Sequence, residues 1–107
     1  MSNERLRQLR EMLIEEPGDY FLRYAIALEL KRQGEMDEAI ADLRSILTEA
    51  PTHIARYYQL ALLLAEVGPI QEAIDTCEAG SLQCLVTGDR KARAELLELR
   101  EALIDTL

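Results

Sequence analysis

The sequence predicts an all-α protein built from stacked helical hairpins. Apolar residues recur at the i, i+3, i+4, i+7 spacing of amphipathic helices, and strand-like alternation is absent. Aromatic residues make up only 5% of the chain, which also disfavours strands. The third observation is an internal repeat, because residues 20–49 align with residues 54–83 at an interval of 34 with eight identities. A period of this length, covering two helices and a glycine turn, is typical of stacked hairpins.

Proline and glycine divide the chain into about six expected helices. The connections are two to five residues long, and such short loops favour antiparallel neighbours. Each helix is bounded by a breaker or by a residue type that caps helices. The expected ranges are 3–15, 20–33, 36–49, 53–67, 70–85 and 90–106.

The first three helices have clear boundary signals. Pro17 and Gly18 end the first, and Asp19 can cap the second, which stops at Gly34. The third stops before Pro51. Their expected core residues are Leu6, Leu9, Leu13, Ile26, Ala27, Leu30, Ala39, Ile40, Leu43, Ile46 and Leu47.

The fourth helix, behind Thr52, is apolar on nearly all sides, so we expect it to be the most buried element. It ends at Gly68, and Pro69 suits the first position of the fifth helix. Gly88 and Asp89 form a turn and a cap before the sixth. The expected core residues of the last two helices are Ala73, Ile74, Cys77, Leu82, Ala92, Leu96, Leu99 and Leu103.

The repeat resembles the tetratricopeptide repeat family over residues 20–85. The residues that carry the resemblance are Ile26-Ala27, Leu30, Gly34, Ala39, Leu43 and Pro51, and again Leu60-Ala61, Leu64, Gly68, Ala73 and Cys77. The resemblance implies a short right-handed solenoid in which the small alanines let paired helices approach closely. It also implies positive φ at Gly34 and Gly68, where the first helix of each hairpin ends.

Two departures from the family pattern affect the interpretation. Arg23 stands where the family often has a large apolar residue, and Gly80-Ser81 replaces the pair seen as Ile46-Leu47, so the second repeat degenerates near its end. We interpret the chain as one domain, 1–107. Its expected parts are a partial repeat or N-terminal helix at 1–16, repeat one at 20–51, repeat two at 54–85 and a capping helix at 89–107.

The charge balance argues against nucleic acid and anionic membranes as partners. The net charge is −8 and the isoelectric point is near 4.6, which makes this an acidic protein. The nearest approach to a basic cluster is Arg5, Arg7 and Arg10, which alternate with acids and are interpreted as a solvated face. The longest apolar run, 60–65, is too short to cross a bilayer, and no apolar segment of a secretory signal follows the first ten residues.

No catalytic, cofactor or metal motif stands out. The chain has one histidine, His53, and lacks the phosphate-loop, nucleophile-elbow and zinc-binding patterns. Cys77 and Cys84 are seven residues apart on one expected helix, about 10 Å along its axis, which is too far for a disulfide. We therefore predict a non-enzymatic protein with free thiols, located in the reducing cytoplasm.

A second stripe of side chains lies beside the core stripe on the first helix of each hairpin. By resemblance to the family, this stripe lines a concave groove that takes an extended peptide or a partner helix, and its aromatic and aliphatic groups beside polar ones suit binding. The alternative is that the last helix folds over the groove and covers it. The candidate groove residues are Phe21, Tyr24, Leu28, Lys31, Arg32, Tyr58, Gln59 and Leu62.

Some family members grip the acidic C-termini of heat-shock chaperones with lysine, arginine and asparagine side chains. The matching positions here hold tyrosine, alanine, leucine and glutamine, so that clamp is absent, although Lys31 and Arg32 could steer an acidic peptide. The competing function is a homodimer that associates through its terminal helices. Its candidate residues either form this seam or widen the buried face of the last helix: Leu97, Ile104 and Leu107.

Overall fold

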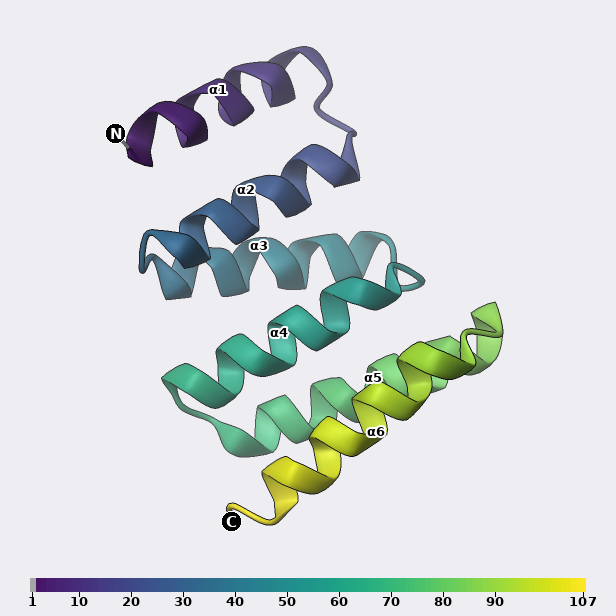
Figure 1. The fold of residues 1–107 in the computed structure, drawn as a ribbon. Helices are drawn as coiled ribbons and strands as arrows, with labels where there is room; N and C mark the ends of the chain where they lie inside the picture. Colours follow the sequence, from purple (N-terminus) through teal and green to yellow (C-terminus); the bar gives the residue numbers. More distant parts are fainter. Residues whose placement is uncertain (1) are drawn as a thin grey trace. The chain divides into compact units, whose positions relative to one another are not determined.

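The computed structural model describes residues 2–107, and within that range it contains six α-helices and no strand (Figure 1). The predicted all-α fold is therefore confirmed, and each helix boundary lies within two residues of the expected one. The helices are α1 (Ser2–Glu15), α2 (Tyr20–Arg32), α3 (Met36–Glu49), α4 (Ile54–Val67), α5 (Ile70–Thr87) and α6 (Arg90–Ile104). They form two compact units that divide within α3, after Ile46.

In the first unit, α2 contacts both of its neighbours. It packs against α1, and the Arg23 guanidinium donates a hydrogen bond of 2.8 Å to Ser45 Oγ of α3. An ion pair of 2.7 Å between Arg10 Nη2 and Glu38 Oε2 joins α1 to α3. The predicted leucine face of α1 is confirmed at Leu6 and Leu9, which are buried, whereas Leu13 is only half-buried.

In the second unit, α5 packs against both α4 and α6. A buried cluster takes one side chain from each of these helices: Tyr57 from α4, Cys84 from α5 and Leu96 from α6. The Tyr57 hydroxyl donates a hydrogen bond of 2.6 Å to the carbonyl oxygen of Pro51, so its polar end is satisfied although the ring is buried. The cluster therefore joins all three helices of the unit.

The predicted aspartate caps are confirmed at two helix starts. Asp19 Oδ1 accepts a hydrogen bond of 3.1 Å from the Leu22 N–H, and Asp89 Oδ1 accepts one of 3.0 Å from the Ala92 N–H. Each bond satisfies one of the backbone donors that a helix start leaves unpaired. These two carboxylates are consequently structural.

The glycine prediction is confirmed at Gly34, where φ is 85°, but it is wrong at Gly68. Gly68 has a φ of 166°, which is extended backbone, and its N–H closes α4 by donating to the Leu64 carbonyl oxygen. Gly68 differs from Gly34 in preceding a proline, and a helical conformation is disfavoured before proline, so α4 ends there without a left-handed residue. Pro69 itself is the residue before α5 and not its first helical residue.

The expectation that α4 is the most buried helix is also wrong. Five residues of α4 are buried, among them Leu60 and Leu64, but α5 buries six and the shorter α2 also buries five. Packing of α2 against α1 contributes to this burial. The apolar composition of the sequence therefore underestimated the burial of α2, which has more charged residues than α4.

The buried face of α5 differs from the predicted one near its end. Leu82, an expected core residue, is 63% exposed, and Gly80, Ser81 and Cys84 are buried in its place. The departure from the repeat pattern at Gly80-Ser81 therefore does not interrupt the helix, which continues to Thr87.

At Gly80, the helices α4, α5 and α6 approach one another closely. A Cβ atom added at this position would lie 2.7 Å from Tyr57 Cβ and 2.9 Å from Leu96 Cδ1. Both distances are below normal contact, and Tyr57 Cβ cannot move without its helix. A residue larger than glycine would therefore push the helices apart.

We expect Gly80→Ala to lower the free energy of unfolding by about 1–2 kcal/mol. Contacts this short put the overpacking cost in the upper part of its usual range, at about 2–3 kcal/mol, and replacing a helical glycine gains back about 1 kcal/mol. Chemical denaturation of both proteins measures the difference. The matched control is Gly18→Ala, since an added Cβ at Gly18 meets nothing within 4 Å. Equal stability of Gly80→Ala and the parent would contradict the close approach.

Candidate functional site

The predicted binding stripe of the first unit lies along one side of α2. Its members Phe21, Tyr24, Leu28 and Lys31 are spaced by three or four residues, so they follow one another along the helix surface. Phe21, the only phenylalanine of the chain, is 72% exposed, while the other three are half-buried. The core stripe beside it, Ile26, Ala27 and Leu30, is buried as predicted.

The corresponding stripe of the second unit lies on α4. Tyr58, Gln59 and Leu62 are all half-buried, and Tyr58 also packs partly against the cluster around Tyr57. The two stripes thus have the same character in their separate units, with aromatic and aliphatic side chains that keep part of their surface in solvent.

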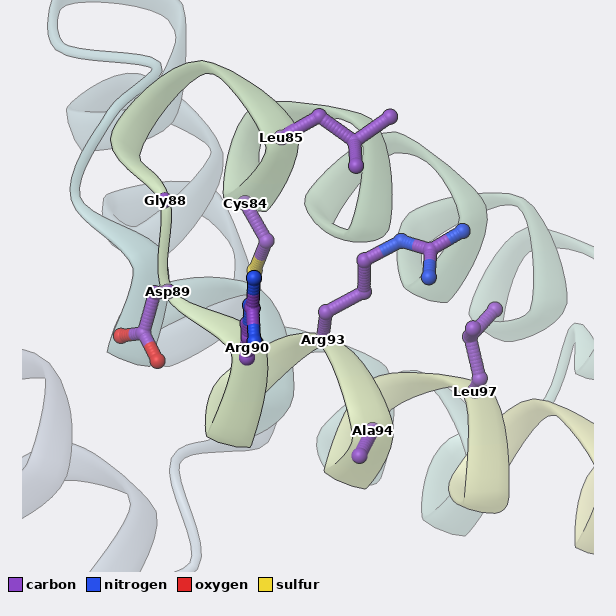
Figure 2. Close-up of a pocket in the computed structure, with 8 residues that line it drawn as sticks. All are labelled: Cys84, Leu85, Gly88, Asp89, Arg90, Arg93, Ala94 and Leu97. Carbon is purple, nitrogen blue, oxygen red and sulfur yellow. The ribbon is translucent and has the colours of Figure 1, made fainter.

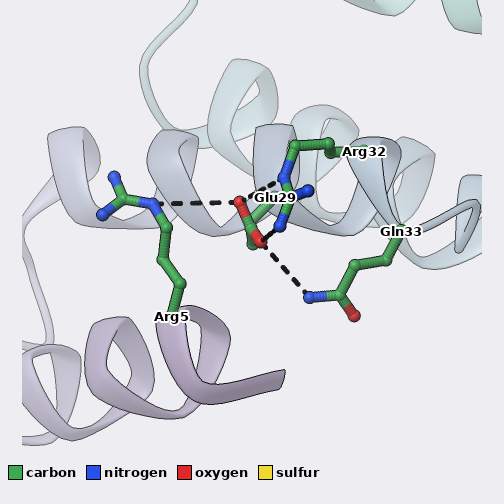
Figure 3. A network of polar contacts seen from close by, with 4 residues as sticks. All are labelled: Arg5, Glu29, Arg32 and Gln33. Carbon is green, nitrogen blue, oxygen red and sulfur yellow. Dashed lines mark hydrogen bonds and ion pairs between the residues drawn. The ribbon is translucent and has the colours of Figure 1, made fainter. Parts of the chain in front are cut away.

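Arg32, a predicted groove residue, takes part in a polar network centred on Glu29 (Figure 3). Arg32 Nε donates a hydrogen bond of 3.1 Å to Glu29 Oε2, and a second guanidinium nitrogen bonds to Glu29 Oε1. Gln33 Nε2 lies 3.4 Å from the same Oε1, and Arg5 Nε of α1 lies 3.8 Å from Oε2. The Arg32 charge is therefore engaged within the first unit.

Sequence reasoning missed Glu29 as a buried residue. It is only 5% exposed, and its repeat equivalent is Leu63, which is 1% exposed. Two features of the sequence could have predicted its burial. Glu29 holds the repeat position of a core leucine, and Arg32 and Gln33 lie one helical turn later, where their side chains can bond to its carboxylate. Hydrogen bonding to Arg32 holds the pKa of Glu29 below its ordinary value of 4.5, and the opposing effect of burial is smaller.

The lowered pKa of Glu29 predicts an acid-dependent loss of stability. Its contribution should be complete above the ordinary carboxylate pKa of 4.5 and disappear as the pH falls through the lowered value. Denaturation of the parent and of Glu29→Gln from pH 7 to pH 2 tests this, and the stability difference between them should shrink with acid. If the difference stayed constant over this range, Glu29 would stabilise the protein through its packing and not through its charge.

The arginines near the N-terminus are ion-paired, as their interpretation as a solvated face requires. Arg5 faces Glu29, Arg7 contacts Glu4 and Glu11, and Arg10 contacts Glu38. Each of these charges has an acidic neighbour within 4.0 Å. This cluster therefore offers no surplus positive charge to a phosphate group.

An open hollow of about 610 Å³ lies between the end of α5 and the start of α6 in the second unit (Figure 2). Its lining is mainly apolar, with the buried Cys84 thiol on one side and two arginines on the other. Figure 2 shows the Arg93 side chain rising from α6 toward α5, whereas the Asp89 carboxylate points away. The lining residues are Cys84, Leu85, Gly88, Asp89, Arg90, Arg93, Ala94 and Leu97.

The two cysteines are buried, free thiols on α5, as predicted. Burial raises the pKa of Cys77 to about 11 and also raises that of Cys84, so both thiols stay protonated at neutral pH. In the part of the chain that the structure describes, no three histidine, cysteine or acidic side chains are grouped as metal ligands. None of the helices within residues 2–107 is long and apolar enough to span a membrane.

Comparison with known proteins finds similarity in structure. No family model and no curated protein matches the sequence. A tetratricopeptide repeat domain protein from Salinibacter ruber, solved by NMR, is 28% identical with a TM-score of 0.78, over 81% of this chain and 88% of that one. Its crystal structure gives 26% identity and a TM-score of 0.75 over 81% and 97% of the two chains.

A more distant structure matches nearly the whole chain. The TPR2B domain of yeast Sti1, solved in a complex with pHsp70, has a TM-score of 0.87 over 99% of this chain and 85% of that one. At 19% identity, this likeness concerns the fold. The matched domains confirm that the six helices form a short solenoid of helical hairpins.

Proposed function

Because the chain is a tetratricopeptide-repeat-like protein, we propose that it is a non-enzymatic protein-interaction module. The partner is a peptide or a helix of another protein, and its proposed contacts are the second stripe of α2 in the first unit and the second stripe of α4 in the second unit. The likeness to repeat domains supports a protein or peptide as the partner class, since one such domain was solved in a complex with pHsp70. We further propose a cytoplasmic location, which the two free thiols support.

The observation that carries this proposal is the exposed stripe of α2. Phe21 exposes 72% of its surface and is followed at helical spacing by the half-buried Tyr24 and Leu28. A contiguous apolar row of this kind marks an interaction surface more often than a scattered exposed residue does. Aromatic side chains are also the usual anchors of protein interfaces.

The chemistry of the proposed site differs from that of a carboxylate clamp. The cation Arg32 is engaged by Glu29, and Tyr58, Gln59 and Leu62 bring no positive charge. We therefore propose an apolar or aromatic segment as the bound element, in preference to an acidic C-terminus. In this proposal, Lys31 contacts a polar group at one end of that segment.

A pull-down from host lysate tests the proposal. Phe21→Asp should fold normally because the side chain is exposed, and it should lose the partner that the parent protein captures. The double variant Tyr24→Asp/Tyr58→Asp, checked for unchanged helicity, should lose it too. The control is Met12→Asp/Ile14→Asp, which places the same charge on exposed apolar positions of α1. Equal capture by all four proteins would move the site away from α2 and α4.

Self-association through the terminal helices is the second candidate function. It is favoured by two side chains at the end of the chain, since Ile104 is 39% exposed and Leu107 is 75% exposed. Leu97, the third candidate, is half-buried and lines the hollow beside Arg93. Light scattering over a range of concentrations separates the two functions, because a constant monomer mass is incompatible with the second.

A further inference from the structure

The hollow between α5 and α6 is bordered by unpaired positive charge. Arg90 and Arg93 line the hollow, and Lys91 lies between them in the sequence. All three are exposed, and their side chains make no hydrogen bond or ion pair with any of residues 2–107. The nearby Asp89 carboxylate is occupied in capping α6. This pattern is the opposite of that on α1, where each arginine has an acidic neighbour.

The position of these cations destabilises α6. They lie in the first turn of α6, which contains no acidic residue, and the positive end of the helix dipole is at this end. Capping and dipole effects would favour acids here, so local helix stability does not account for the three cations. Their placement is instead suited to a negatively charged ligand.

Exposed apolar side chains adjoin these charges on α5. Leu82, Leu85 and Val86 are 63%, 61% and 74% exposed, and their spacing puts them on one side of the helix. Leu85 lines the hollow together with Arg93 and Leu97. The ligand therefore has to offer apolar surface and negative charge at the same time.

We propose that this hollow is a second binding site, distinct from the α2 and α4 stripes, and that it takes an acidic amphipathic peptide segment of another protein. An apolar side chain of the peptide enters the hollow between Leu85 and Leu97, and flanking carboxylates pair with Arg90 and Arg93. An anionic membrane fits less well, because the basic clusters that bind such surfaces contain about 4–8 Lys or Arg residues, whereas only Arg90, Lys91 and Arg93 are grouped here.

The test begins with display of random 14-residue peptides and their selection on the full chain. We expect one class of selected peptides to combine Asp or Glu with large apolar residues. In fluorescence anisotropy, labelled peptides of this class should bind Arg90→Gln/Arg93→Gln about tenfold more weakly than the parent. Leu85→Ala should also weaken them, and rising salt should do the same.

Two controls separate this site from others. Arg7→Gln/Arg10→Gln removes the same charge from the first unit and should leave the affinity unchanged. Tyr24→Asp/Tyr58→Asp should also leave it unchanged, so that failure of the proposed function and failure of this site are distinguishable. The melting temperature of Arg90→Gln/Arg93→Gln should equal or exceed that of the parent, because the cations oppose the helix dipole.

Several results would overturn the proposal. One is a selection without acidic apolar peptides, and another is unchanged peptide affinity in Arg90→Gln/Arg93→Gln. A lower melting temperature of that variant would give the arginines a structural role. Binding to phosphatidylserine vesicles in place of peptides, or a concentration-dependent mass that Arg90→Gln/Arg93→Gln abolishes, would assign the hollow to a membrane or to a second copy of the chain.

Discussion

Replacing Tyr57 by alanine should lower the free energy of unfolding by about 3–5 kcal/mol, the usual cost of deleting a buried aromatic ring. The ring is 6% exposed and forms the α4 part of the cluster that also contains Cys84 and Leu96. Its removal would leave a cavity where three helices meet and would delete the hydroxyl that donates to the Pro51 carbonyl oxygen. Equilibrium denaturation in urea measures the loss.

Tyr57→Phe separates the two contributions of this side chain. It keeps the ring and removes only the hydrogen bond of 2.6 Å, so we expect a loss of about 0.5–1.5 kcal/mol. Tyr57→Ala and Tyr57→Phe should therefore differ by more than Tyr57→Phe and the parent do. If Tyr57→Ala and Tyr57→Phe lowered the free energy of unfolding equally, the hydroxyl and not the packing of the ring would be the main contribution of this side chain.

Leu64→Ala should cost about 2–5 kcal/mol, because the side chain is 2% exposed and a cavity forms in its place. Leu60→Ala, at 5% exposure on the same helix, should cost a similar amount. Thermal and chemical denaturation of each variant measure the change.

The control for both leucines is Leu85→Ala, which deletes the same atoms at a position that is 61% exposed. Its stability should stay within about 0.5 kcal/mol of the parent. A melt of Leu64→Ala that matched the melt of Leu85→Ala would contradict the burial of α4.

Local features of the fold could be read from the sequence because they depend on neighbouring residues. Asp19 and Asp89 cap helices through bonds to a backbone N–H three residues later. Gly34 takes the positive φ that ends a helix, and the 34-residue period identified the paired helices. The repeat pattern does not predict the backbone of Gly68. Gly34 and Gly68 hold the same repeat position, but Gly68 alone precedes a proline and does not take the left-handed conformation of Gly34.

The candidate sites were harder to predict from the sequence than the helices and their ends. Phe21 and Tyr24 could be placed beside the core stripe from spacing alone, and their role in binding stays a prediction. The positive border of the hollow was missed, because the sequence pattern pointed to the arginines of α1 as the nearest approach to a basic cluster and not to those at the start of α6. Only the placement of side chains shows that Arg10 is paired and that Arg90 and Arg93 form no ion pair with the described residues, although Asp89 lies nearby.

The sequence by itself determined the helices, most of their ends and the repeat that pairs them, since these follow from interactions over three or four residues and from periodicity. Only the tertiary structure determines how residues at equivalent repeat positions are packed and which residues they contact. Glu29 and Leu63 are both buried, but the acid requires Arg32 beside it and Arg5 from another helix. Gly80 interrupts the repeat pattern and still packs tightly, because Tyr57 and Leu96 fill the space that a side chain would need. Burial depends on residues distant in sequence, and a one-dimensional pattern does not contain them.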